Sequence, residues 1–421
     1  MNDEKKGLVP RLRFPEFRGA GEWMTVPLEK LATRRTTRNR DGKLGRVLTN
    51  SAEHGVVDQR EYFDKDIATQ GNLENYFVVD INDFVYNPRI SAFAPVGPIS
   101  RNGVAKGVMS PLYTVFRFNN PGNDFYAHYF KSSAWHSYMR EVGSTGARHD
   151  RMAVSNADFL AMPLPVPSPE EQQKIADCLF CLDDLIGAQA DKLDALKTYK
   201  KGLMQQLFPR EGETVPRQRF PEFREAGEWE STKLGDIASI RSGSTPLRSN
   251  SSFYSGGDIP WVKTTDLNNS FIYATEECIT PVSKPKINPV GSVLVAMYGG
   301  FNQIGRTGLL KVSAATNQAL SVLNANRNKV LPIYLLMWLN AKVEVWKRIA
   351  SSSRKDPNIT GSDVASFPIS FPSAEEQQKI ADCLSSFDGL IAAQEDKIDA
   401  LKNHRKGLMQ QLFLYPEDMD A

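Results

Sequence analysis

Residues 300–307, GFNQIGRT, are the stretch of this sequence that comes nearest to a known chemical motif. They almost fit the phosphate-binding loop G-x-x-x-x-G-K-[ST], in which backbone amides and a lysine hold the phosphates of a nucleotide. Arg306 stands at the lysine position, and Gly308 and a β-like run follow where a helix must begin. We therefore do not expect this loop to bind a nucleotide.

Other catalytic and metal-binding patterns are weak or missing. Cys178 and Cys181 form a C-x-x-C, which can serve redox chemistry or zinc, but no second Cys or His pair lies at zinc spacing, so helix packing is the better interpretation. No H-E-x-x-H occurs among the five histidines. No [DN]-P-P-[YF] motif of the adenine methyltransferases occurs either, and residues 87–89, NPR, are the nearest approach. The sequence therefore predicts no catalytic or metal site.

Composition predicts a soluble globular chain. Of 421 residues, 41% are hydrophobic and 24% charged, and the length allows two to four domains. The longest apolar stretch, 331–339, is interrupted by Pro332 and falls short of the ~18 residues that a membrane span needs. The first ten residues do not resemble a secretory signal, and four cysteines argue against a disulfide framework, so we expect a cytoplasmic protein.

The chain contains a long internal repeat. Residues 9–23 recur as 215–229, and residues 168–208 recur as 373–413 with 30 of 41 positions identical. Between these blocks lie two inserts, 24–167 and 230–372, which resemble each other little. A duplicated frame with two unlike inserts suits a protein that holds two specificities in one fixed geometry. The alternative is an ordinary tandem duplication whose halves have drifted, but drift would not spare the helical block so completely.

Charge is distributed unevenly between inserts and repeated blocks. Residues 1–167 hold 22 basic and 18 acidic side chains, and residues 210–372 hold 19 and 14. The block 168–209 holds 5 basic and 7 acidic side chains, and the block 373–421 holds 5 basic and 10 acidic ones. The inserts are thus basic and the helical blocks acidic, so a polyanion would be attracted to the inserts. The excess is modest and is weak support when taken alone.

The repeated block predicts a long, capped helix. Ser168 is a favourable N-cap, Pro169 suits the first helical position, and Glu171 completes a capping box, which Ser373 and Glu376 repeat. Apolar residues then follow at alternating spacings of four and three, which is typical of a coiled coil. The seam residues are Ile175, Leu179, Leu182, Ile186, Leu193, Leu196, Leu203 and Leu207, and in the second copy Ile380, Leu384, Phe387, Ile391, Ile398, Leu401, Leu408 and Leu412.

Polar residues interrupt the seam at the same two places in each copy. Gln189 and Gln394 lie at the midpoints, and Lys200 and Arg405 follow. If the two helices pair antiparallel, the glutamines meet at the pseudo-two-fold axis and can hydrogen-bond each other, which would fix the register. The alternative is that each glutamine lies at a looser, hydrated edge. A helix of this length would span about 58 Å and could act as a rigid spacer.

The chain consists of a basic segment followed by a capped helix that carries EEQQKIADCL, and this arrangement occurs twice. It resembles the specificity subunit of type I restriction-modification systems. The resemblance covers essentially the whole chain. Its most specific parts are the proline-rich helix starts, the two RFPEFR segments and DFVYNPRIS; these are residues 165–175, 371–380, 13–18, 219–224 and 83–91.

The resemblance implies an α+β fold with two globular target recognition domains, each a mixed sheet plus helices, separated by two long antiparallel coiled-coil helices with pseudo-two-fold symmetry. The expected segments are a first recognition domain (1–167), a first helix (168–209), a second recognition domain (210–372) and a second helix with a C-terminal tail (373–421). The segment 9–23 is expected near the C-terminal end of the second helix.

The resemblance also implies a division of labour. Each recognition domain would read one half of an interrupted site in double-stranded DNA, while the helices would set the spacer and dock the partners. Two adenine methyltransferase subunits and two ATP-dependent restriction subunits are the implied partners, and they would carry S-adenosylmethionine, ATP and Mg. This chain would bind no cofactor or metal and would be non-catalytic.

Candidate DNA contacts were chosen because Lys and Arg suit phosphates and Arg, Lys, Asn and Gln suit base edges. They come from a basic run, from two strand exits and from the loops before the helices, where Arg148 and Arg354 lie 24 and 23 residues before Gln172 and Gln377. In the first insert they are Arg34, Arg35, Arg38, Arg40, Tyr86, Asn87, Arg89, Thr145, Arg148, His149 and Arg151. In the second insert they are Arg241, Lys263, Thr264, Tyr298, Asn302, Gln303, Arg306, Arg354 and Lys355.

The sequence leaves other interpretations open. The basic run and the loops before the helices could be solvated connections without a ligand. The whole chain could be a coiled-coil scaffold for two protein-binding domains, although the charge of the inserts argues against this, and a flat response of DNA binding to salt would favour it. It could also be an enzyme with its active site in an insert, which methylation or cleavage by the isolated chain would favour.

Overall fold

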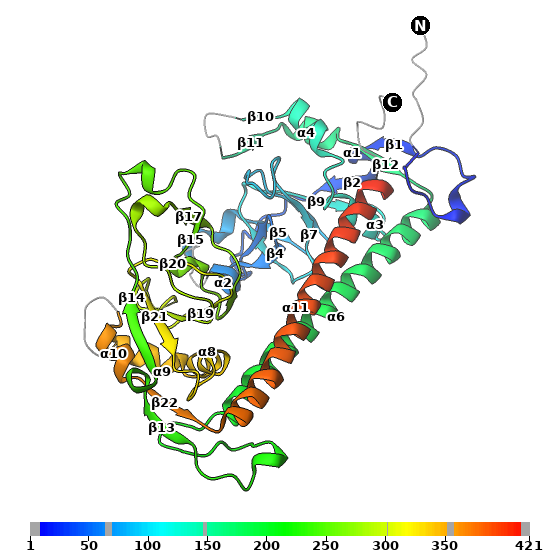
Figure 1. Ribbon diagram of the computed structural model, residues 1–421. Helices are drawn as coiled ribbons and strands as arrows, with labels where there is room; N and C mark the ends of the chain where they lie inside the picture. Colours follow the sequence, from blue (N-terminus) through cyan, green and yellow to red (C-terminus); the bar gives the residue numbers. More distant parts are fainter. Residues whose placement is uncertain (1–8, 64–69, 146–149, 301, 352–357, 414–421) are drawn as a thin grey trace. The chain divides into compact units, whose positions relative to one another are not determined.

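The computed structural model describes residues 9–63, 70–145, 150–300, 302–351 and 358–413. The chain divides into two compact units: unit 1 is residues 1–190 with 396–421, and unit 2 is residues 191–395. The two long helices drawn in Figure 1, α6 (Pro169–Leu207) and α11 (Ala374–Leu412), cross the division. Each unit therefore holds the first part of one long helix and the last part of the other.

Unit 1 consists of many short elements around these helix parts. Its strands are β1 (Met24–Pro27), β2 (Ala32–Arg34), β3 (Leu48–Ser51), β4 (Gly55–Asp58), β5 (Phe77–Val79), β6 (Phe84–Tyr86), β7 (Ile99–Arg101), β8 (Gly107–Met109), β9 (Thr114–Phe118), β10 (Ser144–Thr145), β11 (Met152–Ala153) and β12 (Pro163–Val166). Its short helices are η1 (Pro15–Phe17), α1 (Leu28–Leu31), α2 (Gln59–Phe63), η2 (Gln70–Asn75), α3 (Asp124–Tyr129), α4 (His136–Val142) and α5 (Asn156–Leu160).

Unit 2 has a similar inventory. Its strands are β13 (Glu230–Lys233), β14 (Ala238–Ser242), β15 (Ile259–Val262), β16 (Ser270–Ile272), β17 (Glu277–Ile279), β18 (Val293–Ala296), β19 (Thr307–Leu310), β20 (Ala315–Thr316), β21 (Leu320–Ala325) and β22 (Pro368–Phe371). Its short helices are η3 (Pro221–Phe223), α7 (Leu234–Ile237), η4 (Ser251–Phe253), η5 (Thr264–Asp266), η6 (Pro281–Ser283), α8 (Pro332–Ala341), α9 (Val343–Ser351) and α10 (Gly361–Ser366).

The two inserts share one sheet topology although their sequences differ. In unit 1 the order is β2-β9-β6-β7, antiparallel throughout. In unit 2 the order is β14-β21-β18-β19, again antiparallel, and β16 adds a parallel strand to β19. A short pair, β1 with β12 or β13 with β22, joins the two ends of each insert. These α+β units with two long helices confirm the expected fold class.

Each unit has one main core that joins its sheet to the long helices. In unit 1 the core takes in the sheet residue Phe116, α3, the start of α6 at Ile175 and the end of α11 at Leu412. In unit 2 it takes in Val295, α8, the end of α6 and the start of α11. Because the start of one helix packs with the end of the other in both units, the two helices run antiparallel, as predicted.

The heptad pattern describes the burial of the helices well. Every seam residue that the pattern predicts is buried or half-buried. The polar seam residues form ion pairs with the facing helix: Lys200 with Asp388 in unit 2, and Arg405 with Asp183 at 2.5 Å in unit 1. Gln394 is buried and Gln189 half-buried. The direct hydrogen bond between these glutamines stays a prediction.

The repeated segments meet at a buried ion pair in each unit. Both nitrogens of the Arg13 guanidinium fork lie 2.6 Å from the Glu171 carboxylate, and Arg13 also donates to the carbonyl of Ala20. Arg219 and Glu376 form the same pair in unit 2 at 2.7 Å. The hydrogen bond to Glu171 raises the pKa of Arg13. The RFPEFR and EEQQ segments therefore recur together because this buried ion pair, called the joint below, connects them.

The joint changes the predicted capping box. Ser168 and Ser373 cap as expected, since their hydroxyls accept hydrogen bonds from the backbone amides of Glu171 and Glu376. The expected return bond from the Glu171 side chain is not made, because Arg13 and the indole of Trp23 hold its carboxylate. Of the two hydrogen bonds of a capping box, the one from the glutamate side chain is thus replaced by a tertiary contact.

The first described segment lies against the end of α11. The amide of Leu12 donates to the carbonyl of Gln411 at 3.0 Å, and Gln218 donates to Gln206 in the same way in unit 2. This confirms the predicted place of residues 9–23. Within the described ranges, no helix combines the length and the apolarity that a membrane span requires.

Candidate nucleic-acid interface

Two of the predicted segments in unit 1 leave the sheet at the same edge. β2 and β6 are both antiparallel to β9, so they run parallel to each other. Phe116 of β9 pairs with Arg34 on one side and with Phe84 on the other. The basic run after β2 and the segment after β6 therefore leave the sheet in the same direction, with β9 between the two strands.

The third segment is paired directly with the second. Arg89 and Arg151 form an isolated antiparallel bridge, in which Ile90 donates to Asp150 and Met152 donates to Pro88. Arg89 is exposed and makes no ion pair with a described carboxylate, while Arg151 lies 3.9 Å from the carboxylate of Asp150. Like charges directly opposite each other on a sheet destabilise it, so an anion bound here would relieve a repulsion.

The predicted projection of Tyr86 and Asn87 from this strand is wrong. β6 lies inside the sheet with both faces covered, so Tyr86 is buried, donates to the carbonyl of Val96 at 3.0 Å, and has its pKa raised by desolvation. Asn87 is buried too; its amide donates to the carbonyl of Asn50, and its Oδ1 accepts from the backbone of Arg89. Asn87 thus holds the backbone of Arg89, and neither Tyr86 nor Asn87 projects into solvent.

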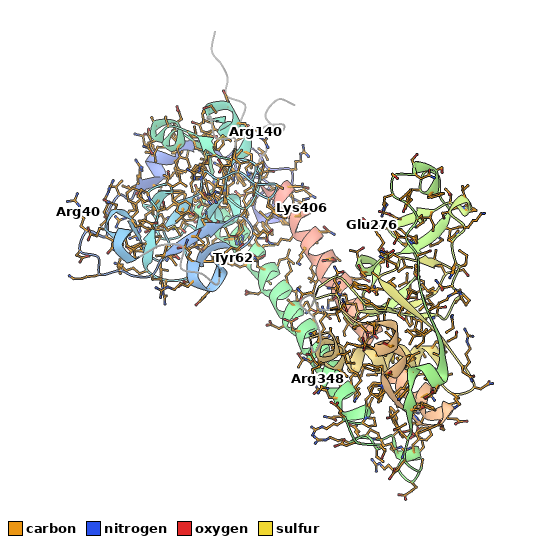
Figure 2. All side chains as sticks on the ribbon, turned by 90° about the vertical axis from the view of Figure 1, so that its left-hand side faces the viewer. Arg40, Tyr62, Arg140, Glu276, Arg348 and Lys406 are labelled. Carbon is orange, nitrogen blue, oxygen red and sulfur yellow. The ribbon has the colours of Figure 1, made fainter. Side chains whose placement is uncertain are left out.

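The basic run after β2 is held in place by its neighbours. The carbonyl of Thr37 accepts from Val78, and the guanidinium of Arg38 donates to Asn75 at 3.1 Å. Arg38 and Arg40 are exposed, Arg34 and Arg35 are half-buried, and none of the four pairs with a described carboxylate. Figure 2 shows Arg40 at the periphery of unit 1. The run is thus an ordered set of cations at the surface of unit 1.

The predicted loops before the long helices lie partly outside the described residues. Thr145 ends β10, but its side chain is outside the description. Arg148, His149, Arg354 and Lys355 are outside it as well. Their roles stay predictions.

Unit 2 builds the same edge from different residues. β14 and β18 run parallel because both are antiparallel to β21, and residues 297–306 connect β18 to β19 at the edge where β14 ends. The amide of Ile359 donates to the carbonyl of Met297, which brings the chain before α10 to this edge. The chain before α10 thus reaches the exit of β18 in unit 2, as the chain before β11 reaches the exit of β6 in unit 1.

The loop between β18 and β19 carries four predicted contacts. Tyr298 and Asn302 are exposed, Gln303 is half-buried, and Arg306 donates from Nε to the carbonyl of Asn302 at 2.9 Å. Glycines with positive φ at 299, 300 and 305 shape its turns. A strand beginning at Thr307 follows, where a nucleotide-binding loop requires a helix.

Two residues of unit 2 that were predicted to contact DNA make intramolecular interactions instead of pointing freely into solvent. Arg241 donates to the side chain of the buried Asn288 at 2.6 and 2.9 Å. Lys263, 18% exposed, lies 2.8 Å from Glu276 and 3.2 Å from Glu277, and these hydrogen bonds raise its pKa. Both side chains are thus engaged within unit 2, and their contact with DNA stays a prediction. Thr264, at the start of η5, is half-buried.

Sequence reasoning missed an ordered arginine in unit 2. The guanidinium of Arg248 lies 4.5 Å from the ring centre of Tyr254 and 5.1 Å from that of Trp261, and it pairs with Glu277 at 2.8 Å. Arginine on aromatic faces is pre-organised for planar recognition. No spacing in the sequence signals this cluster, because its members come from separate elements: Tyr254 follows η4, Trp261 lies in β15 and Glu277 in β17.

Comparison with known proteins places the chain in a family. The family model for the type I restriction modification DNA specificity domain matches residues 59–198 and 226–403. The chain therefore belongs to this family, which confirms the resemblance seen in the sequence.

The relatives are distant and match in part. The EcoR124I/EcoR124II specificity subunit of Escherichia coli is 25% identical over 250 residues, which cover 58% of this chain and 59% of that protein. The MjaIX specificity subunit of Methanocaldococcus jannaschii is 32% identical over 197 residues, 44% of each. The matched part thus spans about half the length of these relatives.

Two solved structures share the fold over nearly the whole chain. A chain from a type I R-M system has a TM-score of 0.61 at 16% identity, covering 93% of this chain and 97% of its own. The S subunit of the type I restriction-modification system from M. genitalium has a TM-score of 0.53 at 12% identity, covering 97% and 99%. At these identities the likeness shows the fold alone.

Proposed function

We propose that this chain is the DNA sequence-specificity subunit of a type I restriction-modification complex. Each recognition domain reads one half of an interrupted site in double-stranded DNA. The observation that carries the proposal is the exit of the central strand, β6 or β18, where each of two unlike inserts brings in the chain that precedes α5 or α10. In unit 1 this exit holds two opposed arginines, Arg89 and Arg151.

In this proposal the cations of unit 1 bind DNA phosphates. Arg89 and Arg151 are close enough to share one backbone segment, and the ordered run at Arg34, Arg35, Arg38 and Arg40 lies at the same edge. Phosphate contacts set the position of a protein on a duplex, while base contacts set the sequence. Thr145, Arg148 and His149, in the loop that ends at Arg151, are proposed to extend this surface.

In unit 2 the loop between β18 and β19 supplies the polar side chains. Asn302, Gln303 and Arg306 are of the types that read adenine and guanine in the major groove. Arg354 and Lys355, which precede the segment bonded to Met297, are proposed to contact the same half-site.

The long helices are proposed to set the spacer and to dock the partners. Supporting this role, each is a continuous helix of 39 residues whose cross-helix ion pairs recur in both units. Two methyltransferase subunits and two restriction subunits would bind here and carry S-adenosylmethionine, ATP and Mg. The chain itself would be non-catalytic and act in the cytoplasm, with residues 1–167 and 210–372 as recognition domains and 168–209 and 373–421 as spacers.

An exchange of inserts tests the modular part of this proposal. Residues 230–372 would be replaced with the corresponding insert of another family member, and methylated adenines would be mapped in cells that also carry the methyltransferase. One half of the motif should change and the other should stay. The reciprocal exchange of residues 24–167 is the matched control and should change the opposite half. A change in both halves after either exchange would refute independent reading.

A further inference from the structure

Phe93 is the most exposed large apolar side chain among the described residues, at 73%. It lies in the connection between β6 and β7, two residues after Ser91. An isolated exposed apolar side chain needs no explanation by itself. The geometry of its loop and the charges beside it are what make Phe93 informative.

The turn that carries Phe93 is fixed by hydrogen bonds and by backbone restriction. Ser91 and Ala94 exchange backbone hydrogen bonds at 3.1 Å, and the Ser91 hydroxyl accepts a third from the amide of Ala94. Gly97 closes the loop at a φ of 82°, where a Cβ would lie 2.1 Å from the carbonyl oxygen of Asn87. The ring is therefore held out into solvent by an ordered loop, so little conformational entropy would be lost on binding.

The loop of Phe93 is also the loop of Arg89. Asn87 fixes the start of this connection by accepting from the amide of Arg89, and Arg151 lies opposite. Phe93 and Arg89 thus lie in one connection, and Arg151 is paired to its start from the segment before β11.

Unit 2 also has an exposed aromatic side chain in the corresponding connection. Tyr298, 44% exposed, lies in the first connection after β18, the strand that corresponds to β6. The two inserts resemble each other little in sequence. An exposed aromatic residue in the connection after the corresponding strand, seven residues after β6 and two after β18, is therefore a second observation.

We propose that Phe93 makes an apolar contact with the bases of the half-site read by unit 1, and that Tyr298 is its counterpart in unit 2. This inference rests on the proposed function and adds specificity residues to it. Apolar side chains contact the thymine methyl group in the major groove or pack against a base at an opened step. Arg89, which lies in the same connection and is proposed to hold a phosphate, favours DNA over a protein as the partner of this ring.

Binding of the assembled complex with its methyltransferase to labelled duplexes tests the inference. Phe93→Ala should weaken binding to the duplex with the methylated site at least about tenfold and change binding to a scrambled duplex less than twofold. Ile81→Ala is the control, because Ile81 is 54% exposed in the turn that precedes β6. Thermal unfolding should be unchanged in both variants, since neither side chain is buried.

Modified duplexes assign the contact. If one thymine-to-uracil change weakens the wild type but not Phe93→Ala, the ring contacts that methyl group. If 2-aminopurine at one position fluoresces more with the wild type than with the variant, the ring packs on an unstacked base. Lost affinity with neither signal would overturn the base contact.

Other outcomes separate this inference from the proposed function. Unchanged DNA binding by Phe93→Ala overturns the inference, whereas a wild-type complex that treats site and scrambled duplex alike overturns the proposed function as well. Weaker assembly of Phe93→Ala with the methyltransferase, with normal DNA binding once assembled, would show that the ring is a protein contact and also overturn the inference.

Discussion

Arg89 and Arg151 face each other across an isolated antiparallel bridge, although one follows strand β6 and the other precedes strand β11. Arg89 follows a strand-like run and Arg151 ends the loop before the first long helix, so the sequence does not show that they meet. Their pairing turns two separate candidates into one cationic site.

Replacing Arg151 by alanine should weaken DNA binding and its salt dependence together. If Arg151 neutralises one phosphate, the slope of log K against log salt should fall in magnitude by about 0.9. Binding should weaken similarly on specific and scrambled duplexes, because a phosphate carries no sequence information. Titrations at several salt concentrations provide the slope.

A cation elsewhere on unit 1 controls for general loss of charge. Lys30 is exposed and lies in α1, before β2, whereas the basic run follows β2. Lys30→Ala should leave the slope unchanged. An equal fall for Lys30→Ala, or an unaltered slope for Arg151→Ala, would remove the arginine pair from the interface.

Breaking the buried joint should destabilise unit 1. Glu171→Ala leaves the Arg13 guanidinium buried without its partner, and such losses cost about 3–5 kcal/mol. Glu170→Ala, an exposed neighbour in the same helix turn, should change the unfolding midpoint little. Denaturant unfolding compares the two variants, and equal stability for both would contradict the structural role of the joint. Glu376→Ala should have the corresponding effect on unit 2.

Local patterns in the sequence predict the parts of the fold that local forces determine. The seam from Ile175 to Leu207 follows from a spacing that repeats within one helix, and the capping serines follow from the helix start. The ends of β6 and β18 are marked by runs of apolar residues. These features need no knowledge of distant residues, and the structure has them as predicted.

Long-range contacts explain where sequence reasoning failed. Tyr86 ends a strand whether it points into the core or out of it, and only the neighbours of β6 decide that it is buried. Lys263 looks like a free cation until folding brings Glu276 and Glu277 to it. The alternation of a strand end and the charge of a loop do not contain this information.

His128 should make unit 1 sensitive to acid. Burial, with a smaller contribution from Lys131, lowers its pKa to about 4, and both ring nitrogens lack a hydrogen-bond partner among the described residues. The neighbouring Asp183 opposes this shift, while Arg405 and Arg101 add to it. Between pH 6.5 and 4, His128 therefore binds a proton in the unfolded chain but not in the folded chain. Stability is lost as the pH falls through this range.

A leucine at this position should remove that sensitivity. In unit 2, Leu336 lies two residues after Tyr334, as His128 lies two after Tyr126, and both tyrosines donate to the end of the last strand. His128→Leu should abolish up to about 3 kcal/mol of destabilisation between pH 7 and pH 4. His54→Leu, at an exposed site, serves as the control. Parallel pH profiles for wild type and His128→Leu would contradict the prediction.

Lengthening both long helices should widen the spacer of the recognised site. One added heptad in each helix extends the pair by about 10 Å, which corresponds to about three base pairs. The two half-sites should stay as they are. Methylation mapping in cells reads the outcome directly, and an unchanged spacer with full activity would show that the helices do not measure the interval.

Genome-wide mapping of methylated adenines tests the central claim most directly. Cells would carry this gene with the methyltransferase of the same system, and the comparison would lack only this gene. The account predicts one motif of two short halves with an unread interval, present only when the gene is present. Methylation that does not depend on the gene, or that follows a single uninterrupted motif, would contradict it.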